Sequence, residues 1–417
     1  MAGTDGSLEK TRLTLGFVPL TDCAPLVMGV EKGFFARQGL DVTLSREASW
    51  ANIRDKVAVG LLDGAQMLAG IPLAATAGVG RMNVPMLTGI ALGLNGNAIT
   101  VSETLHRLMA EADPAAMAAH PASACALKPV IEARRAAGRP GLTFGVVLPV
   151  SSHAYQLRGW LSSAGIDPNR DVQLVVVPPP HMVASLKAGE IDGYCVGEPW
   201  NTQAVHEGIG RIAVTGYELW NNSPEKVLGV TAAWAAENPG THGALIRALI
   251  ETARWLDQPD SREETARVLA ADHHVGVPAA VLRASLTGSV RYAAGAPVRA
   301  LPDFTVFHRY AATFPWRSHA LWFLAQMVRW GQLPADADLS GIAASVYRAD
   351  LYRAAAAELG EPAPLADAKP EGLHDAPWIL DAAVAPIAMG PDRFFDGRRF
   401  DPADPLGGLP SAVSIPA

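Results

Sequence analysis

Short apolar runs alternate with amphipathic segments through the first part of this chain, and this alternation constrains its fold more than any other feature. The expected strands are 13–18, 41–45 and 64–68, followed by an apolar run at 88–94, and the expected helices are 24–32 and 50–59. Alternation of this kind predicts parallel α/β units, because parallel neighbours need a helical crossover between them.

The alternation starts again at residue 142. Strands are expected at 142–148, 172–177, 193–196, 211–215 and 227–232, and helices at 152–164 and 181–188. After about Asn238, long Ala-, Leu- and Arg-rich segments at 243–256, 262–271 and 319–330 predict helices. The stretch after Pro362 is rich in Pro, Gly and Asp, and we expect it to wrap the surface.

The chain has 417 residues, which is long for one core. We therefore expect an α/β protein of two lobes with a helical C-terminal third. Lobe I takes residues 1–98 and 217–417, and lobe II takes residues 99–216. Because open α/β sheets bind ligands beyond the carboxyl ends of their strands, the loops after the strands are the places to search for a site.

Charge and composition exclude several classes of protein. The net charge is −7 without a long basic run, which argues against a nucleic-acid surface. The N-terminus has no apolar signal region, and no apolar stretch is long enough to span a membrane. The three cysteines, Cys23, Cys125 and Cys195, are far apart and have no metal-ligand or disulfide spacing. We expect a cytoplasmic protein without direct contacts to nucleic acid or membrane.

A set of recognisable stretches runs along the chain in a fixed order. They are GFVPLTDCAPLVMGVEKGFFARQGLDV (16–42), EASWANIRDK (47–56), LDGAQMLAGIP (62–72), NGNAIT (95–100), SSHAYQLRGWL (151–161), PPPHMVASLKAGEIDGYCVGEPWN (178–201), PEKVLGVT (224–231) and ALWFLAQMVRWG (320–331). Together they resemble the nitrate/bicarbonate-binding protein family associated with ABC transporters, and especially its leaderless cytoplasmic nitrate/nitrite sensors (NasS type).

The resemblance implies a two-lobed fold of the periplasmic-binding-protein type (class II-like) that closes on nitrate or nitrite, with no cofactor, no metal and no catalytic residues. The positions that match the family's nitrate contacts are Trp50, Asn97, His153, Gly197, Glu198 and Lys226. Two positions depart from the family's pattern. Asn97 stands where transport relatives usually have glutamine, and His181 replaces a glutamine in the PPPQM stretch; both changes are expected to affect the pocket wall.

Nitrate is planar and singly charged, so its pocket needs a positive charge, several donors and a flat wall. Lys226 could supply the charge, and its loss by Lys226→Ala is expected to weaken binding by roughly two to three decades with the fold intact. The alternative is a solvated lysine in the turn after Pro224. Bicarbonate-binding relatives tend to carry an acidic residue at this position, consistent with their use of calcium, so Lys226 argues against bicarbonate and against a required metal.

The other candidates also have structural alternatives. His153 could donate to an anion at a helix N-terminus, or it could be a surface residue in a helix that Ser151 or Ser152 caps, with Ser152 a good candidate. Trp50 could offer its indole N–H and a flat face, or it could be a core residue of an amphipathic helix. Asn97 follows a glycine in an expected turn, from which its amide could donate to the anion.

Gly197 and Glu198 follow an apolar strand. Gly197 would let backbone N–H groups approach a ligand closely. The Glu198 carboxylate repels an anion, so we expect it to pair with Lys226 or a histidine and to fix its position, or else to interact with a helix N-terminus. Asp22, in the first matched loop, is expected to serve lobe packing.

Three functions are compatible with these observations. The first is a cytoplasmic nitrate/nitrite sensor; the resemblance implies that such a protein holds a small RNA-binding antiterminator and releases it on binding ligand. The second is the substrate-binding component of an ABC-type nitrate transporter, although Cys23 lies inside a matched loop and is unsuited to lipid anchoring. The third is an enzyme, which is disfavoured because Cys195 lies in an expected buried strand and no nucleophile–base pattern is apparent.

Overall fold

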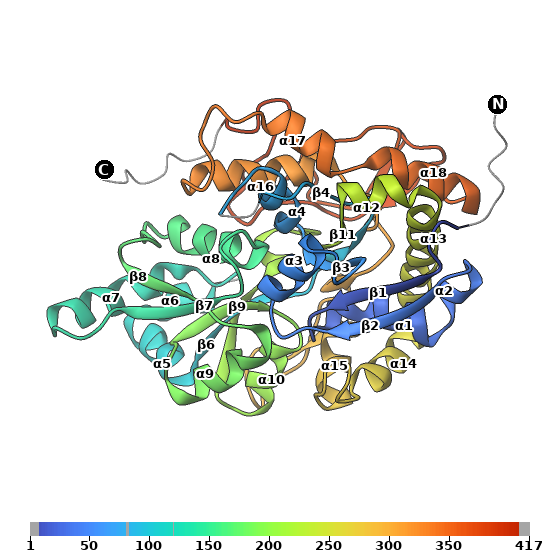
Figure 1. Cartoon of the computed structure of the whole chain (residues 1–417). Helices are drawn as coiled ribbons and strands as arrows, with labels where there is room; N and C mark the ends of the chain where they lie inside the picture. The colour runs from blue at the N-terminus through green and yellow to red at the C-terminus, as the bar shows by residue number, and fades with distance from the viewer. Residues whose placement is uncertain (1–7, 81–82, 120, 408–417) are drawn as a thin grey trace.

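Two β-sheets lie beside one another and form two lobes (Figure 1). The computed structural model describes residues 8–80, 83–119 and 121–407. The larger sheet has seven strands in the order β14-β5-β11-β3-β1-β2, with β4 paired to β11. These strands are β1 (Arg12–Phe17), β2 (Asp41–Arg46), β3 (Gly64–Leu68), β4 (Met86–Leu87), β5 (Ala91–Asn95), β11 (Pro224–Thr231) and β14 (Thr305–Val306).

The smaller sheet has five strands in the order β10-β6-β9-β7-β8. They are β6 (Asn97–Ser102), β7 (Leu142–Val146), β8 (Val172–Val176), β9 (Gly193–Gly197) and β10 (Gly210–Thr215). Each sheet contains parallel strands, as the alternation predicted: β1 pairs with β2 and β3, and β7 with β8 and β9. The strands that follow each crossover, β6 and β11, are antiparallel to their neighbours.

The chain passes between the sheets twice. β5 ends at Asn95 and β6 begins at Asn97, and Gly96 between them has a φ of 86°, a left-handed conformation that favours glycine. The return runs from Thr215 through α11 (Gly216–Leu219) to Pro224. The expected boundaries between lobe I and lobe II, at 98/99 and 216/217, remain a prediction. The two passages lie side by side, because Ser223 N donates to the Asn95 side chain and Asn95 N donates to the Ser223 carbonyl.

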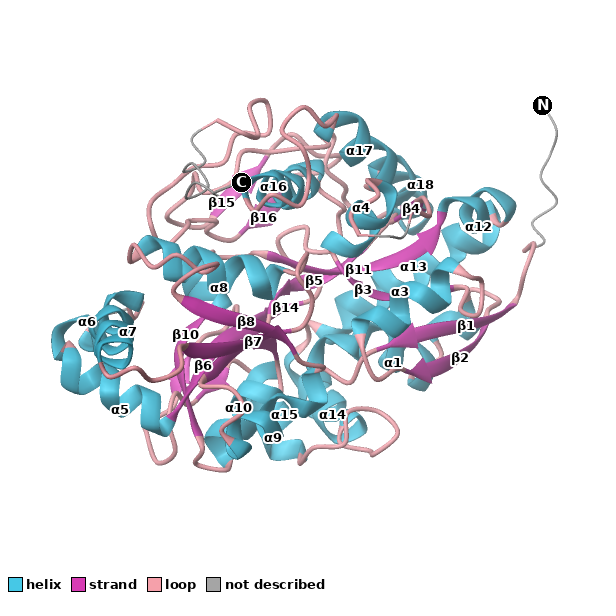
Figure 2. Cartoon of the chain, turned by 60° about the vertical axis from the view of Figure 1, so that its left-hand side comes forward, coloured by secondary structure: helices cyan, strands magenta, loops and turns pink. Residues whose placement is uncertain are grey.

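Helices cover both faces of the two sheets (Figure 2). Those of the larger lobe are α1 (Ala24–Glu31), α2 (Phe34–Arg37), α3 (Trp50–Ala58), α4 (Gly70–Thr76), α12 (Ala232–Glu237), α13 (Pro239–Leu256), α14 (Pro259–Leu269) and α15 (Ala279–Leu286). Those of the smaller lobe are α5 (Glu103–Ala112), α6 (Pro114–Ala118), α7 (Leu127–Ala136), α8 (Ser152–Ser163), α9 (Met182–Ala188) and α10 (Trp200–His206). Short 3-10 turns are η1 (Thr21–Cys23), η2 (Ala124–Ala126) and η3 (Pro179–His181). Among the described residues, no helix combines the length and the apolar character needed to cross a bilayer.

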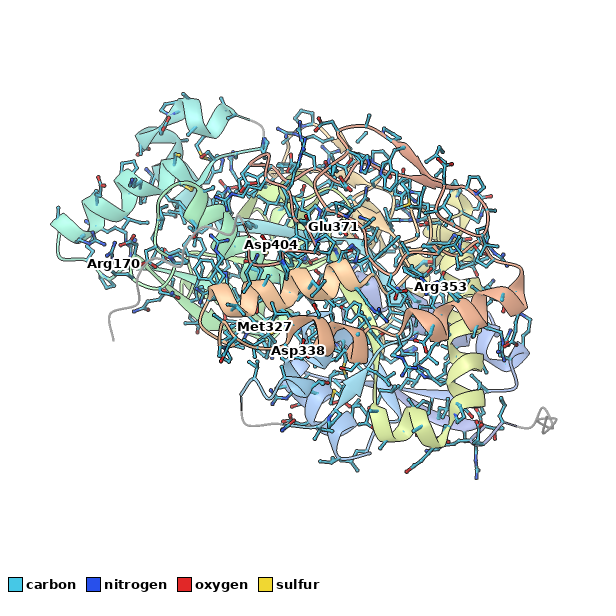
Figure 3. All side chains as sticks on the ribbon, turned by 90° about the horizontal axis from the view of Figure 1, so that it is seen from above. Arg170, Met327, Asp338, Arg353, Glu371 and Asp404 are labelled. Atoms are coloured by element: carbon cyan, nitrogen blue, oxygen red, sulfur yellow. The ribbon has the colours of Figure 1, made fainter. Side chains whose placement is uncertain are left out.

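The C-terminal part of the chain packs over the larger lobe as α16 (Arg317–Arg329), α17 (Leu339–Val346) and α18 (Ala349–Leu359). The tail beyond them runs beside α16, where Figure 3 labels Glu371 and Asp404. Ser318 Oγ donates to Glu371 at 2.7 Å, so the tail is fixed to α16 by a buried contact and follows the surface as expected. Two small hairpins, β12 (Ser289–Val290) with β13 (Arg299–Ala300) and β15 (Trp378–Leu380) with β16 (Ile387–Met389), complete the fold.

Candidate functional site

Lys226 lies in β11 with only 1% of its surface exposed, so the alternative of a solvated lysine in a turn is wrong. The pairing of β11 with β5 is irregular on both sides of Lys226. In a regular strand, neighbouring side chains point to opposite faces, and such irregularities redirect them. Here Lys226 Nζ forms an ion pair with the adjacent Glu225 as well as with Asp22 Oδ2, at 2.7 Å from the latter.

Asp22 pairs with Lys226 in this site and also lies at the lobe contact, as expected, because its Oδ2 would be 3.5 Å from a Cβ at Gly197 of the other lobe. It lies in η1 directly after β1, and its other oxygen accepts a hydrogen bond from Gln66. Burial raises the pKa of Asp22, although Lys226 opposes the rise. Burial alone would lower the pKa of Lys226, but the carboxylates of Asp22 and Glu225 raise it, so the ammonium stays charged.

Glu225 connects most of the site's polar side chains, a role that no local pattern in the sequence predicts. One carboxylate oxygen contacts Lys226 and lies 3.3 Å from His153 Nε2. The other accepts hydrogen bonds from Asn97 Nδ2 at 2.6 Å and from Ser152 Oγ. The side chain is 3% exposed. Strand alternation would place Glu225 on the face opposite Lys226, and only the irregular register brings both into one cluster.

His153 lies in the first turn of α8 and is completely buried, so the alternative of a surface residue is wrong. Ser151 caps this helix by accepting from Ala154 N, whereas the expected cap, Ser152, donates to Glu225. Burial, and secondly Lys226, lower the pKa of His153 well below its usual value. The imidazole is therefore neutral, with one N–H donor, and neither ring nitrogen has a hydrogen-bond partner within the described part of the chain.

Asn97 is the first residue of β6 and pairs with Gly197 of β9, so it lies in a strand and not in a turn. Its amide nitrogen donates to Glu225 and, at 3.2 Å, to Gln156 Oε1. Both amide hydrogens therefore already have acceptors in this structure, and the role of Asn97 as a nitrate contact stays a prediction. Gly197 holds the two lobes close: a Cβ there would meet Leu20 at 3.3 Å and Asp22 Oδ2 at 3.5 Å.

Glu198 pairs neither with Lys226 nor with a histidine, which corrects the main expectation for this residue. Its Oε2 accepts from Thr202 N in the first turn of α10 at 3.2 Å, as the helix-terminus alternative predicted. Its Oε1 is buried without a hydrogen-bond partner in the described structure. Burial raises the pKa of Glu198 to about 7, with the Thr202 hydrogen bonds opposing. The carboxyl group is thus partly protonated at neutral pH and can act as a donor.

Trp50 begins α3 after the Ser49 cap and is 1% exposed. The core alternative for Trp50 is correct as far as burial goes, but the residue also faces the site, because Lys226 Nζ lies 5.3 Å from the centroid of its ring. The indole Nε1 is buried and has no hydrogen-bond partner among the described residues. The larger lobe therefore contributes Trp50 and Lys226, and the smaller lobe contributes His153, Gly197 and Glu198.

Backbone contacts hold the lobes together around this cluster. Thr21 N donates to the Glu198 carbonyl at 2.7 Å, and Trp200 Nε1 donates to the Pro19 carbonyl at 3.1 Å. A small pocket opens beside Lys226, and its lining includes Asp22, Glu198 and Glu225. His181 is exposed on η3 and is not part of this lining, so the expected effect of its replacement on the pocket wall is wrong.

Several polar atoms of these residues are buried without hydrogen-bond partners among the described residues, and of the residues that carry them Glu198 lines the pocket beside Lys226. These atoms are Trp50 Nε1, Asn97 Oδ1, both ring nitrogens of His153 and Glu198 Oε1. Buried polar atoms in folded proteins almost always have partners, so several such atoms together indicate a position for a small polar ligand. Within the described ranges no group of three or more His, Cys, Asp and Glu residues is arranged to hold a metal ion. Lys226 Nζ instead lies between the two carboxylates that a cation would otherwise bridge.

Comparisons with known proteins identify relatives along the whole chain. A model of the NMT1-like family matches residues 6–270. The chain is 34% identical to the nitrate/nitrite binding protein NrtA of Nostoc sp., over 95% of this chain and 84% of NrtA. It is 32% identical to the bicarbonate-binding protein CmpA of Synechococcus elongatus, over 97% of this chain and 87% of CmpA. It is 39% identical to the nitrate import ATP-binding protein NrtC of Synechocystis sp., but spans only 55% of that protein's length.

The solved structures confirm the expected fold. The crystal structure of the periplasmic nitrate-binding protein NrtA from Synechocystis superposes with a TM-score of 0.84 at 31% identity, covering 97% of this chain and 100% of that one. The ligand-binding component of an ABC-type import system from Staphylococcus aureus, at 16% identity and a TM-score of 0.63, shares the fold alone. The chain thus has the two-lobed fold of periplasmic binding proteins.

Proposed function

The chain belongs to the NMT1-like family, and from this premise we propose that it binds nitrate or nitrite in the site around Lys226. Relatives that match almost its full length are named for binding these anions. The observation that carries the proposal is the group of buried, unpartnered polar atoms contributed by Trp50, His153 and Glu198 next to a buried ammonium. These are donors that a small planar acceptor can satisfy.

The proposed binding needs a donor for each oxygen of the anion. An ammonium has three N–H donors, and the Lys226 contacts to Asp22 and Glu225 occupy two of them. The third, the indole N–H of Trp50, the N–H of neutral His153 and the O–H of protonated Glu198 are available to the ligand. The Trp50 ring supplies the flat wall that a planar anion needs.

The charges at the site decide how strongly an anion can bind. Asp22 and Glu225 together outweigh Lys226 when both carboxyl groups are ionised, so the cluster has no excess positive charge. An anion then binds best when Glu198 is protonated, because the neutral carboxyl donates a hydrogen bond instead of repelling the ligand. The proposed binding is therefore linked to the protonation of Glu198.

Lys226 also favours nitrate over bicarbonate, which is the ligand named for CmpA. Its Nζ bridges two carboxylates. By the resemblance, bicarbonate-binding relatives use a calcium ion, and in this proposal Lys226 replaces that ion. Nitrate and nitrite carry no proton and only accept hydrogen bonds, which suits the donors of Trp50 and His153.

Calorimetry with nitrate, nitrite, bicarbonate and sulfate tests the proposal. We expect nitrate or nitrite to bind at one site per chain, and bicarbonate and sulfate to bind at least tenfold more weakly, a difference of about 1.4 kcal/mol. The variant Asn52→Ala is a control on the exposed face of α3, two residues from Trp50. Binding of bicarbonate as tight as that of nitrate, or no binding of either, contradicts the proposal.

We further propose that binding is reported to a soluble regulator inside the cell, an antiterminator that the ligand-free protein holds. This proposal is supported by the resemblance to the cytoplasmic nitrate/nitrite sensors of the family. Delivery to an ABC-type importer is the second candidate, and the names of NrtA and NrtC favour it equally. Catalysis is not proposed, because burial raises the pKa of the Cys195 thiol well above its usual value and the thiolate does not form.

Co-purification from cells grown with and without nitrate separates the two outputs. A sensor should bring down a soluble RNA-binding partner only without nitrate, because ligand and partner stabilise different forms and oppose each other reciprocally. Release of the protein by osmotic shock, with no soluble partner in either culture, would refute the sensor and support import.

A further inference from the structure

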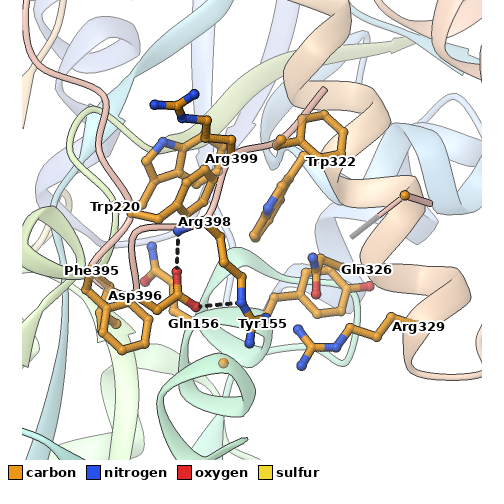
Figure 4. Close-up of a pocket in the computed structure, with 15 residues that line it drawn as sticks. Tyr155, Gln156, Trp220, Trp322, Gln326, Arg329, Phe395, Asp396, Arg398 and Arg399 are labelled. Atoms are coloured by element: carbon orange, nitrogen blue, oxygen red, sulfur yellow. Dashed lines mark hydrogen bonds and ion pairs between the residues drawn. The ribbon is translucent and has the colours of Figure 1, made fainter. Parts of the chain in front are cut away.

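A second, larger pocket includes residues of α8 in its lining (Figure 4). Its volume is about 100 Å³. Its walls come from α8, from the end of α11, from α16 and from the tail that crosses them. None of the six residues expected to bind nitrate lines it.

Aromatic rings form one wall of this pocket. The rings of Trp220 and Trp322 have centroids 5.0 Å apart, and Tyr155 meets Trp322 edge-on at 6.0 Å. Phe394 of the tail stacks on the far side of Trp220 at 4.5 Å. Tyr155 and Trp220 are themselves buried, and Trp322 is half-buried, so a flat aromatic ligand can meet this wall at Trp322.

The rest of the lining is positively charged. Arg329, Arg398 and Arg399 line the pocket, and Asp396 is the only acid in the lining. Asp396 Oδ2 lies 3.2 Å from Arg398 Nε and so opposes one of the three charges. This excess of positive charge contrasts with the net charge of −7 of the whole chain.

Arg329 has no carboxylate within 4 Å among the described residues, and its Nε is buried without a hydrogen-bond partner there. Figure 4 shows its guanidinium and that of Arg398 reaching the same end of the pocket. Burial, and secondly the charge of Arg398, lower the pKa of Arg329 to about 10, so it is still a cation at neutral pH. The two guanidinium groups face the same space, and Asp396 balances the charge of Arg398 alone. Such a pair of guanidinium groups is suited to binding an anion.

We propose that this pocket binds a flat aromatic anion, with its carboxylate or phosphate held by Arg329 and Arg398 and its ring against Trp220 and Trp322. The guanidinium groups match the planar oxygen pairs of such anions. The aromatic wall excludes water from one side of the ligand and strengthens this electrostatic contact. A small inorganic anion alone would leave the apolar wall uncovered and would bind weakly.

The pocket is also connected to the Lys226 site. Gln156 lines the pocket, and its Oε1 accepts from Asn97 at 3.2 Å while its Nε2 donates to Ser223 Oγ at 3.4 Å. One turn earlier, α8 carries His153 of the other site. A ligand that bridges α8 and α16 therefore favours one arrangement of the lobes, and, if the proposed nitrate function is correct, it changes nitrate affinity.

Calorimetry of the full chain with 2-naphthoate, 2-naphthamide and acetate tests the pocket. Naphthoate should bind once per chain, and the neutral amide and the ringless acetate should each bind at least tenfold more weakly. The double variant Arg329→Gln, Arg398→Gln should weaken naphthoate binding at least tenfold and leave the amide unchanged. Arg107→Gln, an exposed arginine on α5 paired with Glu111, is the matched control and should change nothing.

Absence of naphthoate binding at 10 mM, a scale on the order of the weakest affinities measured for such ligands, overturns the pocket proposal. Equal affinities for naphthoate and naphthamide, or a double variant that binds naphthoate as wild type does, also overturn it. Arg329 and Arg398 are both at least partly exposed, so their substitution should not disturb the core. An unchanged melting temperature of the double variant shows that the fold persists.

Titration of nitrate with and without saturating naphthoate tests the coupling. A change of at least threefold in nitrate affinity supports it, and equal affinities refute it. A chain that binds naphthoate but no nitrate refutes the proposed nitrate function together with the coupling, while the pocket stands on the naphthoate measurement.

Discussion

Lys226 Nζ lies 2.7 Å from Oδ2 of Asp22, so the only ammonium in the candidate anion site already has a counter-charge before any ligand binds. Glu225 contacts the same Nζ from the other side. The site therefore attracts an anion through hydrogen-bond donors and through proton binding more than through net charge. The predictions below separate these contributions.

Asp22→Asn should tighten nitrate binding. The amide keeps an oxygen for the hydrogen bond from Gln66 but removes the negative charge beside Lys226. We expect about a tenfold gain at pH 8, since one unit charge at a few ångströms and an effective dielectric near 20 amounts to ~1–4 kcal/mol before screening. Calorimetry measures it, and Asp192→Asn, which caps Thr143 N in the smaller sheet, is the control. An Asp22→Asn protein that binds nitrate more weakly would show that the lysine must be held by both carboxylates.

Nitrate affinity should fall as the pH rises through about 7. Burial raises the pKa of Glu198 to about 7, so the carboxyl is neutral below this pH and charged above it. The neutral form can donate to the anion and the charged form repels it, so affinity is highest at acidic pH and declines by up to tenfold per pH unit above 7. Affinities measured from pH 5.5 to 8.5 at constant ionic strength test this.

Glu198→Gln is the control for the pH profile, because its side chain is neutral throughout. The variant should bind nitrate with nearly the same affinity across the range. His153 is not expected to reproduce the decline above pH 7, because burial holds its pKa well below the usual value and the imidazole is neutral there. A sloping profile that persists in Glu198→Gln would assign the linked proton to another group, with Asp22 the next candidate.

Trp50→Phe should have opposite effects on binding and on stability. The variant removes the buried Nε1 donor, which has no hydrogen-bond partner among the described residues. Because an unpartnered buried donor is unfavourable, we expect its removal to stabilise the ligand-free protein by about 1 kcal/mol. It also removes a hydrogen bond to the anion, which weakens nitrate binding by roughly three- to tenfold. Thermal unfolding with and without nitrate measures both effects. Trp378→Phe, whose Nε1 donates to the Gly390 carbonyl in the tail, is the control and should leave nitrate affinity unchanged.

Lys226→Ala should destabilise the protein strongly, which revises the expectation that the fold stays intact. Removing one member of a buried ion-pair cluster leaves Asp22 and Glu225 without their counter-charge, at a loss of about 3–5 kcal/mol in the free energy of unfolding. Urea denaturation measures this loss. Adding Asp22→Asn to Lys226→Ala should recover part of it, and an equal loss in the double variant would show that Asp22 is not the group left unpaired.

The sequence predicted the elements that carry the site with good accuracy. The expected strand at 64–68 is β3, and the expected helix at 152–164 is α8 (Ser152–Ser163) with one residue less. Their local signals are strong, because apolar runs bounded by turns and a serine cap depend only on neighbouring residues. The helices α5 to α7, between residues 103 and 136, were not predicted, although α5 has a pronounced apolar periodicity.

Contacts between remote residues were harder to predict. Asp22 was assigned to lobe packing and Glu225 received no role, yet both contact Lys226. Glu225 was missed because strand alternation places it opposite Lys226, and the irregular register of β11 against β5 is set by the neighbouring strand. Ser151 and Ser152 are alternative helix caps in the sequence, and the use of Ser152 as a donor to Glu225 depends on a contact between α8 and β11, which belong to different lobes.

The sequence by itself determined the α/β alternation, the two-lobed fold and the polar residues that the site contains, because these follow from local periodicity and from the order of matched stretches. The tertiary structure alone decided which carboxylates oppose Lys226, that His153 is buried and neutral, and that Glu198 is close to its titration point at neutral pH. Charge compensation and desolvation depend on distances between residues from different strands and lobes. Those distances exist only after the sheets have paired and the lobes have met.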